Sequence, residues 1–210
     1  MEDQSKALHF SQNVTEFVQL AADFCLFVEH TPQFRKKDYV RKLHQLLPLL
    51  YLKGTLLPKT ESIFDDDNEH FVAEEEWIQI HNKVKQKLGY HDEYPEIFDP
   101  QTHEDELQST ASLADNMADI YQDLKNFISL YHVGNDDLMN DALWEIQMNF
   151  EEFWGQKCAN AMRALHRVYY GTDDLEEEED EEENQQNPTL EDIDTRNWIL
   201  TQRQADYKDQ

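Results

Sequence analysis

Apolar side chains recur through most of the chain at intervals of three and four residues, which is the period of an amphipathic α-helix. The pattern breaks at prolines and glycines, because the residue before proline avoids the helical conformation and glycine commonly ends a helix. Together the two signals predict five helices, over residues 5–30, 34–53, 73–88, 102–132 and 135–170. Each helix has one apolar stripe to bury, so we expect an all-α helical bundle.

Local signals refine the ends of these helices. Thr102, with Asp105 three residues later, resembles a capping box that would start the fourth helix. Asn135 is a suitable N-cap for the fifth helix. Gly54 is expected to end the second helix. Gly155 stands inside the fifth helix, where glycine costs about 1 kcal/mol relative to alanine, and it would let a neighbouring helix approach closely.

The composition changes after Gly171. Ten acidic residues and one leucine stand between Asp173 and Glu183, without a basic residue. Such a block repels itself and cannot bury a core, so residues 172–188 are predicted to be a disordered acidic linker. Residues 189–210 regain some apolar side chains and are predicted to be a C-terminal segment in which a short helix could start. The helical bundle itself is predicted over residues 5–171.

Residue counts favour few, long elements and a reducing compartment. Five glycines and six prolines are too few for the many turns of a β protein. Cys25 and Cys158 each fall within a predicted helix, where a buried free thiol is the expected state. No apolar run approaches the ~18–20 residues of a transmembrane helix, and the first residues lack a signal-peptide pattern. We therefore predict a cytoplasmic protein.

Charge narrows the choice of partners. The chain has 45 acidic and 18 basic residues, which give a formal net charge of −27. A polyanion repels phosphate backbones and anionic lipid surfaces, so neither a nucleic acid nor a membrane is expected as a partner. A basic protein or a cation fits this charge better, although the same charge also serves solubility. No nucleotide-binding or other cofactor motif is present, and no cofactor is predicted.

Two predicted helices each carry a row of acids spaced four residues apart, which places each row on one helix face. The rows are Asp115, Asp119 and Asp123 on the fourth helix, and Asp137, Asp141 and Glu145 on the fifth. If the rows face each other, Asp115, Asp119, Asp141 and Glu145 would form a metal cradle of the kind used by all-α metal-dependent phosphohydrolases. If the rows face outward, they are solvated surface, and the sequence leaves both arrangements open.

Aromatic residues in acidic surroundings are candidates for binding a partner. Tyr94 and Phe98 lie in a predicted loop over residues 90–101 that mixes aromatic and acidic side chains. They could pack onto the bundle or form a recognition edge for a basic partner. Trp198 lies in the C-terminal segment, where it could pack back on the bundle or bind a partner.

The overall layout resembles a bacterial family, common in Bacteroides-type organisms, that is described only as a domain of unknown function. The resemblance rests on the helical run from Phe17 to Tyr170, the Leu-Leu-Pro-Leu-Leu-Tyr segment over residues 46–51, and the acidic stretch after Gly171. It implies an acidic helical protein and transfers no activity or site residue.

The leading functional prediction is a non-catalytic interaction protein that binds a basic partner through its acidic surface and tail. It rests on the charge distribution and on the lack of a catalytic motif, which favours a protein that is not an enzyme. The alternative is the metal-dependent phosphohydrolase with the four carboxylates named above.

Overall fold

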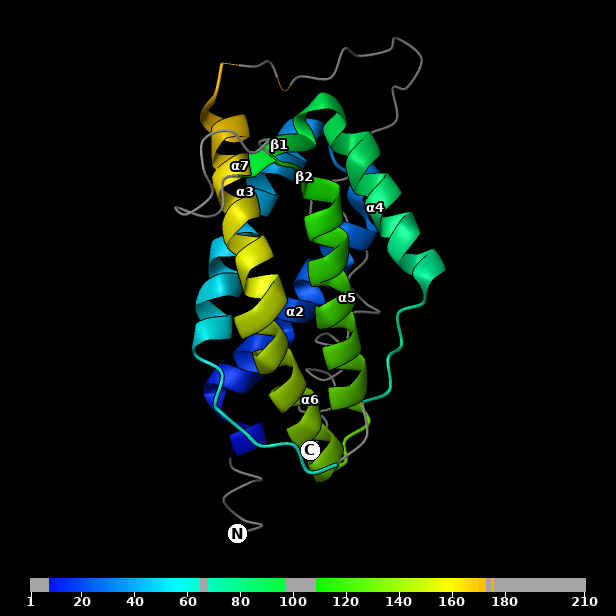
Figure 1. Cartoon of the computed structure of the whole chain (residues 1–210), viewed down its shortest axis with the longest axis vertical. Coiled ribbons are helices and arrows are strands. Elements are labelled where there is room, and N and C mark those ends of the chain that lie inside the picture. The colour runs from blue at the N-terminus through cyan, green and yellow to red at the C-terminus, as the bar shows by residue number, and fades with distance from the viewer. Residues whose placement is uncertain (1–7, 65–67, 97–108, 173–174, 176–210) are drawn as a thin grey trace, which may run out of the picture.

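A computed structural model describes residues 8–64, 68–96, 109–172 and 175 of the chain. It confirms the all-α bundle (Figure 1). The helices of the described residues are α2 (Gln12–Glu29), α3 (Lys36–Thr55), α4 (Glu74–Leu88), α5 (Leu113–His132), α6 (Asp136–Asn149) and α7 (Gly155–Tyr170). A short antiparallel hairpin joins α4 to α5 and consists of β1 (Glu93–Glu96) and β2 (Ser109–Ser112). The predictions for residues 176–210 lie outside the described residues.

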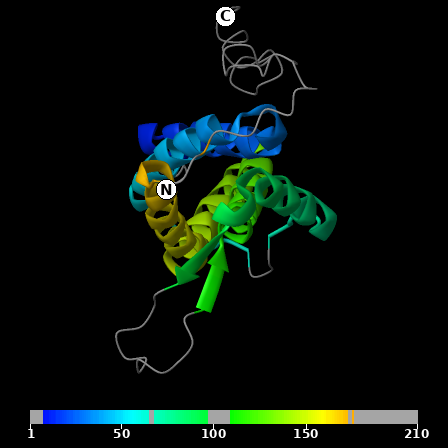
Figure 2. The same cartoon turned by 90° about the horizontal axis from the view of Figure 1, so that it is seen from above.

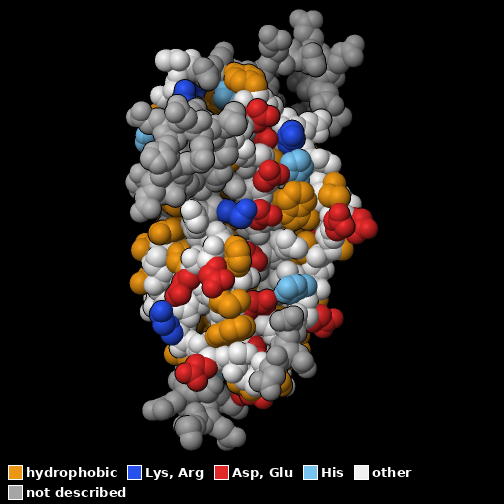
Figure 3. Space-filling view, viewed as in Figure 1, with side chains coloured by type: hydrophobic (Ala, Val, Ile, Leu, Met, Phe, Trp, Pro, Cys, Tyr) orange, Lys and Arg blue, Asp and Glu red, His pale blue; other side chains and the backbone are white. Residues whose placement is uncertain are grey.

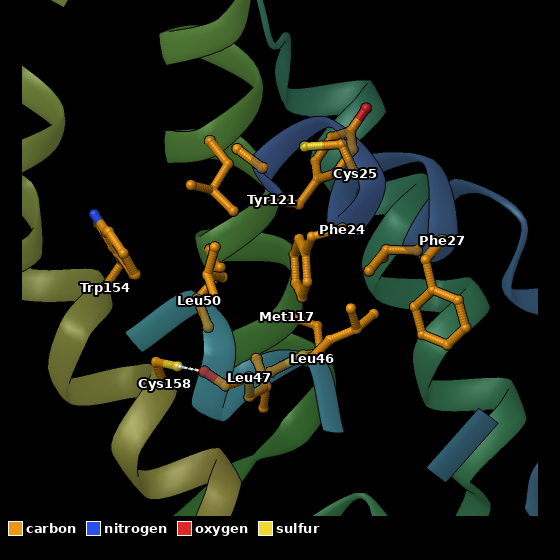
Figure 4. Packing of buried hydrophobic residues seen from close by; sticks show 14 of the residues in the cluster. Phe24, Cys25, Phe27, Leu46, Leu47, Leu50, Met117, Tyr121, Trp154 and Cys158 are labelled. Carbon is orange, nitrogen blue, oxygen red and sulfur yellow. Dashed lines mark hydrogen bonds between the residues drawn. The ribbon is translucent and has the colours of Figure 1, made fainter. Parts of the chain in front are cut away.

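The helices pack around one apolar core. Seen from above, α2 and α3 lie on one side of the bundle, α5, α6 and α7 lie on the other, and α4 packs along α5 (Figure 2). The hairpin projects away from the bundle in the same view. The largest fully buried side chains include Trp154, Tyr39, Tyr121 and Phe17. Figure 4 shows residues of α2, α3, α5 and α7 meeting in this core, as their apolar stripes predict.

Both cysteines are buried in the core as free thiols, as predicted. The Sγ of Cys158 on α7 donates a hydrogen bond of 3.4 Å to the carbonyl oxygen of Leu47 on α3 (Figure 4). Burial raises the pKa of both thiols, and for Cys158 to about 12. Thiols with so little thiolate are poor nucleophiles, so their position indicates a packing role. Among the described residues, no helix is both long enough and apolar enough to cross a membrane.

The start predicted for the fourth helix was wrong. Residues 109–112 form strand β2 instead of helix, and α5 begins at Leu113. Ser112 is the true N-cap, because its Oγ accepts a hydrogen bond from the backbone N–H of Asp115 at 3.1 Å. Asp92, at the other side of the hairpin, accepts a bond of 2.7 Å from the backbone N–H of Ala114. A carboxylate here also compensates the positive end of the helix dipole. The Thr102–Asp105 signal lies outside the described residues.

The predicted fifth helix contains a break. α6 and α7 are joined by a π-helical turn over Phe150–Trp154. A Cβ at Gly155 would meet the carbonyl oxygen of Phe150 at 2.3 Å, so the turn needs glycine there. The close approach between helices predicted at Gly155 occurs at Gly54, where a Cβ would meet the Trp154 ring at 2.8 Å. Gly54 lies inside α3, which ends at Thr55. The prediction that Gly54 ends this helix was therefore wrong.

Asn135 caps α6 as predicted. Its Oδ1 accepts hydrogen bonds from the backbone N–H groups of Asp137, at 2.9 Å, and Leu138, at 3.4 Å. Gly134 just before it has a φ of +77°, a conformation that favours glycine. This tight turn brings α6 back beside α5, and it thereby places the acids of the two helices on neighbouring surfaces.

Candidate functional site

The acidic rows of α5 and α6 approach each other at one place, around Asp123. A small pocket opens there, which we call the acidic pocket; its lining is His70, Asp123, Asn126, Phe127, Ala142, Glu145, Ile146 and Asn149. The space open to the centre of a water-sized group is about 10 Å³, which is room for about one such group. Figure 3 shows acidic and histidine side chains distributed over the face of the molecule on which α5 and α6 lie. The acidic pocket is thus a polar hollow in an acidic surface.

Asp123 is the most perturbed carboxylate of the pocket. Its Oδ1 accepts a hydrogen bond of 3.1 Å from Nδ2 of Asn149. Burial, with a smaller contribution from the negative charges of Asp119 and Glu145, raises the pKa of Asp123 to about 6 against the opposing hydrogen bond from Asn149. Charge on this carboxylate is therefore poorly compensated, so a cation that entered the pocket would be stabilised there.

Glu145 forms the opposite wall of the acidic pocket. Its Oε2 accepts a hydrogen bond of 2.8 Å from Nδ2 of Asn68, and its Oε1 lies 2.9 Å from Nε2 of His70. Both partners come from the segment between α3 and α4, more than seventy residues away in the sequence. These contacts hold the segment over the end of α6. The lining that the structure describes contains no lysine or arginine, so no permanent cation neutralises the pair.

Asp119 lies one turn before Asp123 on α5 and has two donors of its own. The indole Nε1 of Trp77 donates to its Oδ1 at 2.8 Å, and Nζ of Lys157 lies 2.7 Å from its Oδ2. The ion pair is partly exposed, so its contribution to stability is small, about 1 kcal/mol or less. Asp119 therefore joins α5 to α4 and α7, and it acts on the acidic pocket through its charge alone.

Asp141 is used to fix a loop to α6. Its side chain is buried, and its two oxygens accept bonds from the backbone N–H groups of Ile63, at 2.7 Å, and Phe64, at 2.9 Å. Ser62 Oγ and Asn140 Nδ2 lie at 3.3 and 3.0 Å from the same carboxylate. All its acceptor positions are thus directed to the protein, and we call this set of contacts the Asp141 latch.

Asp115 stands at the other end of the α5 row, near the hairpin. Its Oδ1 lies 3.2 Å from Nε2 of His81 on α4. The structure therefore does not bring Asp115, Asp119, Asp141 and Glu145 together, because each contacts a different set of partners. Within the part of the chain that the structure describes, no group of three or more His, Cys, Asp or Glu side chains is arranged to hold a metal ion.

Of the residues predicted to bind a partner, only Tyr94 is described. It lies in β1 with 9% of its side chain exposed, and its hydroxyl oxygen accepts a hydrogen bond from Nδ2 of Asn116 on α5. Tyr94 therefore packs onto the bundle, which is one of the two predicted arrangements. Phe98 and Trp198 lie outside the described residues.

Asp123 belongs to the predicted acidic row of α5, but the sequence pattern does not single it out. The four-residue spacing of the row does not distinguish Asp123 from Asp119. The two carboxylates differ in the hydrogen-bond donors around them, which the sequence pattern does not show. His70 and Asn68 were also missed, since a loop residue has no period that shows which helix it covers. The signal that was available is Asn149, which falls four residues after Glu145 and therefore shares its helix face.

Comparison with known proteins places the chain in a family. A crystal structure of protein BF1032 from Bacteroides fragilis is similar, with 38% sequence identity and a TM-score of 0.71, over 79% of this chain and 98% of that chain. A search of curated proteins gives no match. A family model described as a domain of unknown function, DUF5063, matches residues 9–171. The resemblance to a bacterial domain of unknown function is thereby confirmed, and the chain belongs to the DUF5063 family.

Proposed function

We propose that this protein is a cytoplasmic, non-catalytic interaction protein that binds a basic segment of a partner protein, with a lysine of that segment in the acidic pocket. The observation that carries the proposal is the buried, poorly compensated carboxylate of Asp123, which lies in the same pocket as Glu145 in a described lining without lysine or arginine. A bound cation would compensate the charge of Asp123 and remove its repulsion from Glu145, and both effects favour binding.

The size of the acidic pocket favours lysine over arginine. The pocket has room for about one water-sized group, and an ammonium group has that size. A planar guanidinium is larger and would remain at the entrance. Charge outside the pocket adds to the attraction, since the net charge of −27 includes the acids of residues 173–183. Such a field raises the rate of association with a basic partner and makes it dependent on salt.

The phosphohydrolase alternative has weaker support. It requires several carboxylates on one ion, whereas Asp141 is committed to the Asp141 latch and Asp115 lies beside His81 at the other end of the row. Only Asp119 and Glu145, of its four residues, lie near the acidic pocket. The same pocket residues separate the two ideas experimentally, because a metal would compete with a lysine for them.

The experiment measures the affinity of the full chain for a labelled oligolysine peptide by fluorescence anisotropy, at physiological salt. The site variant is D123N/E145Q, and the matched control is E74Q/E75Q, which removes the same charge from two exposed glutamates of α4. Losing one charge-assisted contact of about 1.5–3 kcal/mol weakens binding by about 10- to 100-fold, so this is the expected effect of the site variant. The control should change affinity by about threefold or less.

Three results decide the matter. Equal losses in both variants would show that the peptide senses only net charge, and the pocket proposal would be wrong. If the wild type binds oligolysine more tightly than oligoarginine of equal length, and the site variant does not, the acidic pocket would be supported as the lysine-binding site. Competition by micromolar Mg²⁺ or Mn²⁺ in the wild type alone would instead favour the metal alternative.

A further inference from the structure

An apolar stripe covers the outer face of the second half of α3. It consists of Leu49 and Leu52 of α3 and of Leu56, the C-cap that follows it, which are 51%, 53% and 44% exposed. Their spacing of three and four residues puts the three side chains on one line, which we call the α3 stripe. The opposite face of α3 is buried against α7 and α2. Single exposed leucines are ordinary, but a line of three along one helix indicates a surface that something covers.

We propose that the C-terminal segment of this same chain, residues 189–200, docks on the α3 stripe. The segment lies outside the described residues, and its sequence supplies the apolar side chains that such a stripe would bind: Leu190, Ile193, Trp198, Ile199 and Leu200. Tryptophan and branched aliphatic side chains give the largest burial per residue on such a surface. This docking goes beyond the proposed function, because it concerns a different face of the molecule from the acidic pocket.

The path of α7 brings the start of the tail to α3. The two helices run antiparallel, since Cys158 contacts Leu47 whereas the His166 and Tyr170 rings near the end of α7 lie 5.6 and 5.5 Å from the His44 ring. Just beyond α7, Leu175 is buried in the core cluster. The chain therefore leaves the described bundle close to the first half of α3.

The tail is long enough to reach the stripe without strain. The distance along the helix axis from His44 to Leu52 is about 12 Å, and to Leu56 about 18 Å, at 1.5 Å per residue. Leu190 lies fifteen residues after Leu175, and a random-coil chain of that length has an average span of about 20 Å. A tether whose average length matches the distance gives an effective concentration on the order of 1 mM. A contact with an intrinsic Kd of about 0.1 mM would then be about nine-tenths docked.

Charge favours the same path. The acids of residues 173–183 follow α7 directly, and the first half of α3 carries a basic group of residues over positions 35–42. Its members are Arg35, Lys36, Lys37, Arg41 and Lys42, against the single acid Asp38. An acidic linker that runs along this half of α3 would be attracted to it, and that attraction directs the apolar end of the tail toward the α3 stripe.

The experiment measures disulfide formation in the full chain with two introduced cysteines, L52C and I199C. Both native cysteines are buried, which leaves the introduced pair as the reactive thiols. The matched control carries the same two cysteines together with W198S and L200S, so that tether length and charge are unchanged while the docking side chains are lost. Under mild oxidation we expect an intrachain disulfide to form about tenfold faster in the first protein than in the control.

Each outcome is informative. Equal rates in the two proteins would mean that the tail visits the stripe by random motion, and the proposal would be wrong. A disulfide-linked dimer that forms faster at higher protein concentration would also overturn it, since a second copy would then be the occupant. If the C-terminal segment does not dock, the affinity of the acidic pocket for the oligolysine peptide is still expected to be unchanged. The two proposals are therefore tested independently.

Discussion

The Asp141 latch provides the sharpest test of how the acids of this protein are used. The perturbation is D141N, which keeps the shape of the side chain and removes its charge. The amide has only one oxygen, so it can accept a bond from Ile63 or Phe64 but not from both. Its NH₂ group would face the remaining backbone N–H, and two donors repel each other.

The contacts give the magnitude of the effect. The carboxylate accepts backbone bonds of 2.7 and 2.9 Å, and its side chain is 1% exposed. A hydrogen bond to a charged group contributes about 1.5–3 kcal/mol, and an unsatisfied buried donor costs a similar amount. We therefore expect the free energy of unfolding to fall by about 2–3 kcal/mol. For a chain of this size that corresponds to a melting temperature about 5–10 °C lower.

The assay is thermal unfolding followed by circular dichroism in metal-free buffer, with D137N as the matched control. Asp137 lies one turn earlier on α6, is exposed, and interacts with the helix dipole. Its loss should cost about 0.3–1 kcal/mol, or about 1–4 °C. If D141N melted at the same temperature as D137N, the latch would contribute nothing, and Asp141 would again be available for a ligand, as the metal hypothesis requires.

Two further predictions concern the acidic pocket and the packing of α3. Because burial raises the folded-state pKa of Asp123 to about 6, above an unfolded value of about 3.9, the folded protein binds the extra proton and its stability rises as pH falls through about 6. Urea unfolding at pH 7 and pH 5 should show a gain of about 1.3 kcal/mol in the wild type relative to D123N, since the gain is complete only below the unfolded pKa; a difference that did not change with pH would contradict it. In G54A the new Cβ would lie 2.8 Å from the Trp154 ring, and overpacking of about 1–3 kcal/mol should exceed the gain of about 1 kcal/mol in helix propensity. A melting temperature above that of the wild type would show that the contact can relax.

Periodicity predicted the helices well where it was long and uninterrupted. α3 and α4 begin and end within about two residues of their predicted limits, because their apolar stripes end there and, for α4, Gly89 follows the last turn. The fourth helix shows why a capping signal alone is weaker. Its apolar stripe starts at Leu113, where α5 does begin, whereas Thr102 suggested a start eleven residues earlier. The polar run Ser109–Ser112 has no strand alternation, so β2 was not predictable from pattern.

The break between α6 and α7 was hidden for a related reason. A π-helical turn inserts one extra residue into a helix, which shifts the apolar stripe by much less than a full turn, so the pattern still looks continuous. Gly155 marked the place, but its cause is local: the carbonyl of Phe150 occupies the position of a side chain. The close contact between helices lies instead at Gly54, and such a contact between distant segments cannot be derived from either segment alone.

The candidate site could be predicted only as far as the two acidic rows. Spacing of four residues correctly put the acids of each helix on one face, but the role of each acid depends on the donors that other segments bring. In the described part of the chain, Asp141 receives two backbone N–H groups, Asp119 receives an indole and an ammonium, and Asp123 receives one amide. Asp123, which has the fewest donors of the three, also has the raised pKa, chiefly because it is buried.

This distribution bears on what a net charge of −27 means for binding. An acid whose lone pairs already accept hydrogen bonds within the fold gains little from a partner, since an added cation must displace those donors. Asp141 and Asp92 belong to this group, because they hold a loop and a helix start. Exposed acids attract a partner from a distance but give little affinity once solvated. A specific contact therefore requires a carboxylate that is partly desolvated and still short of donors, and Asp123 meets both conditions.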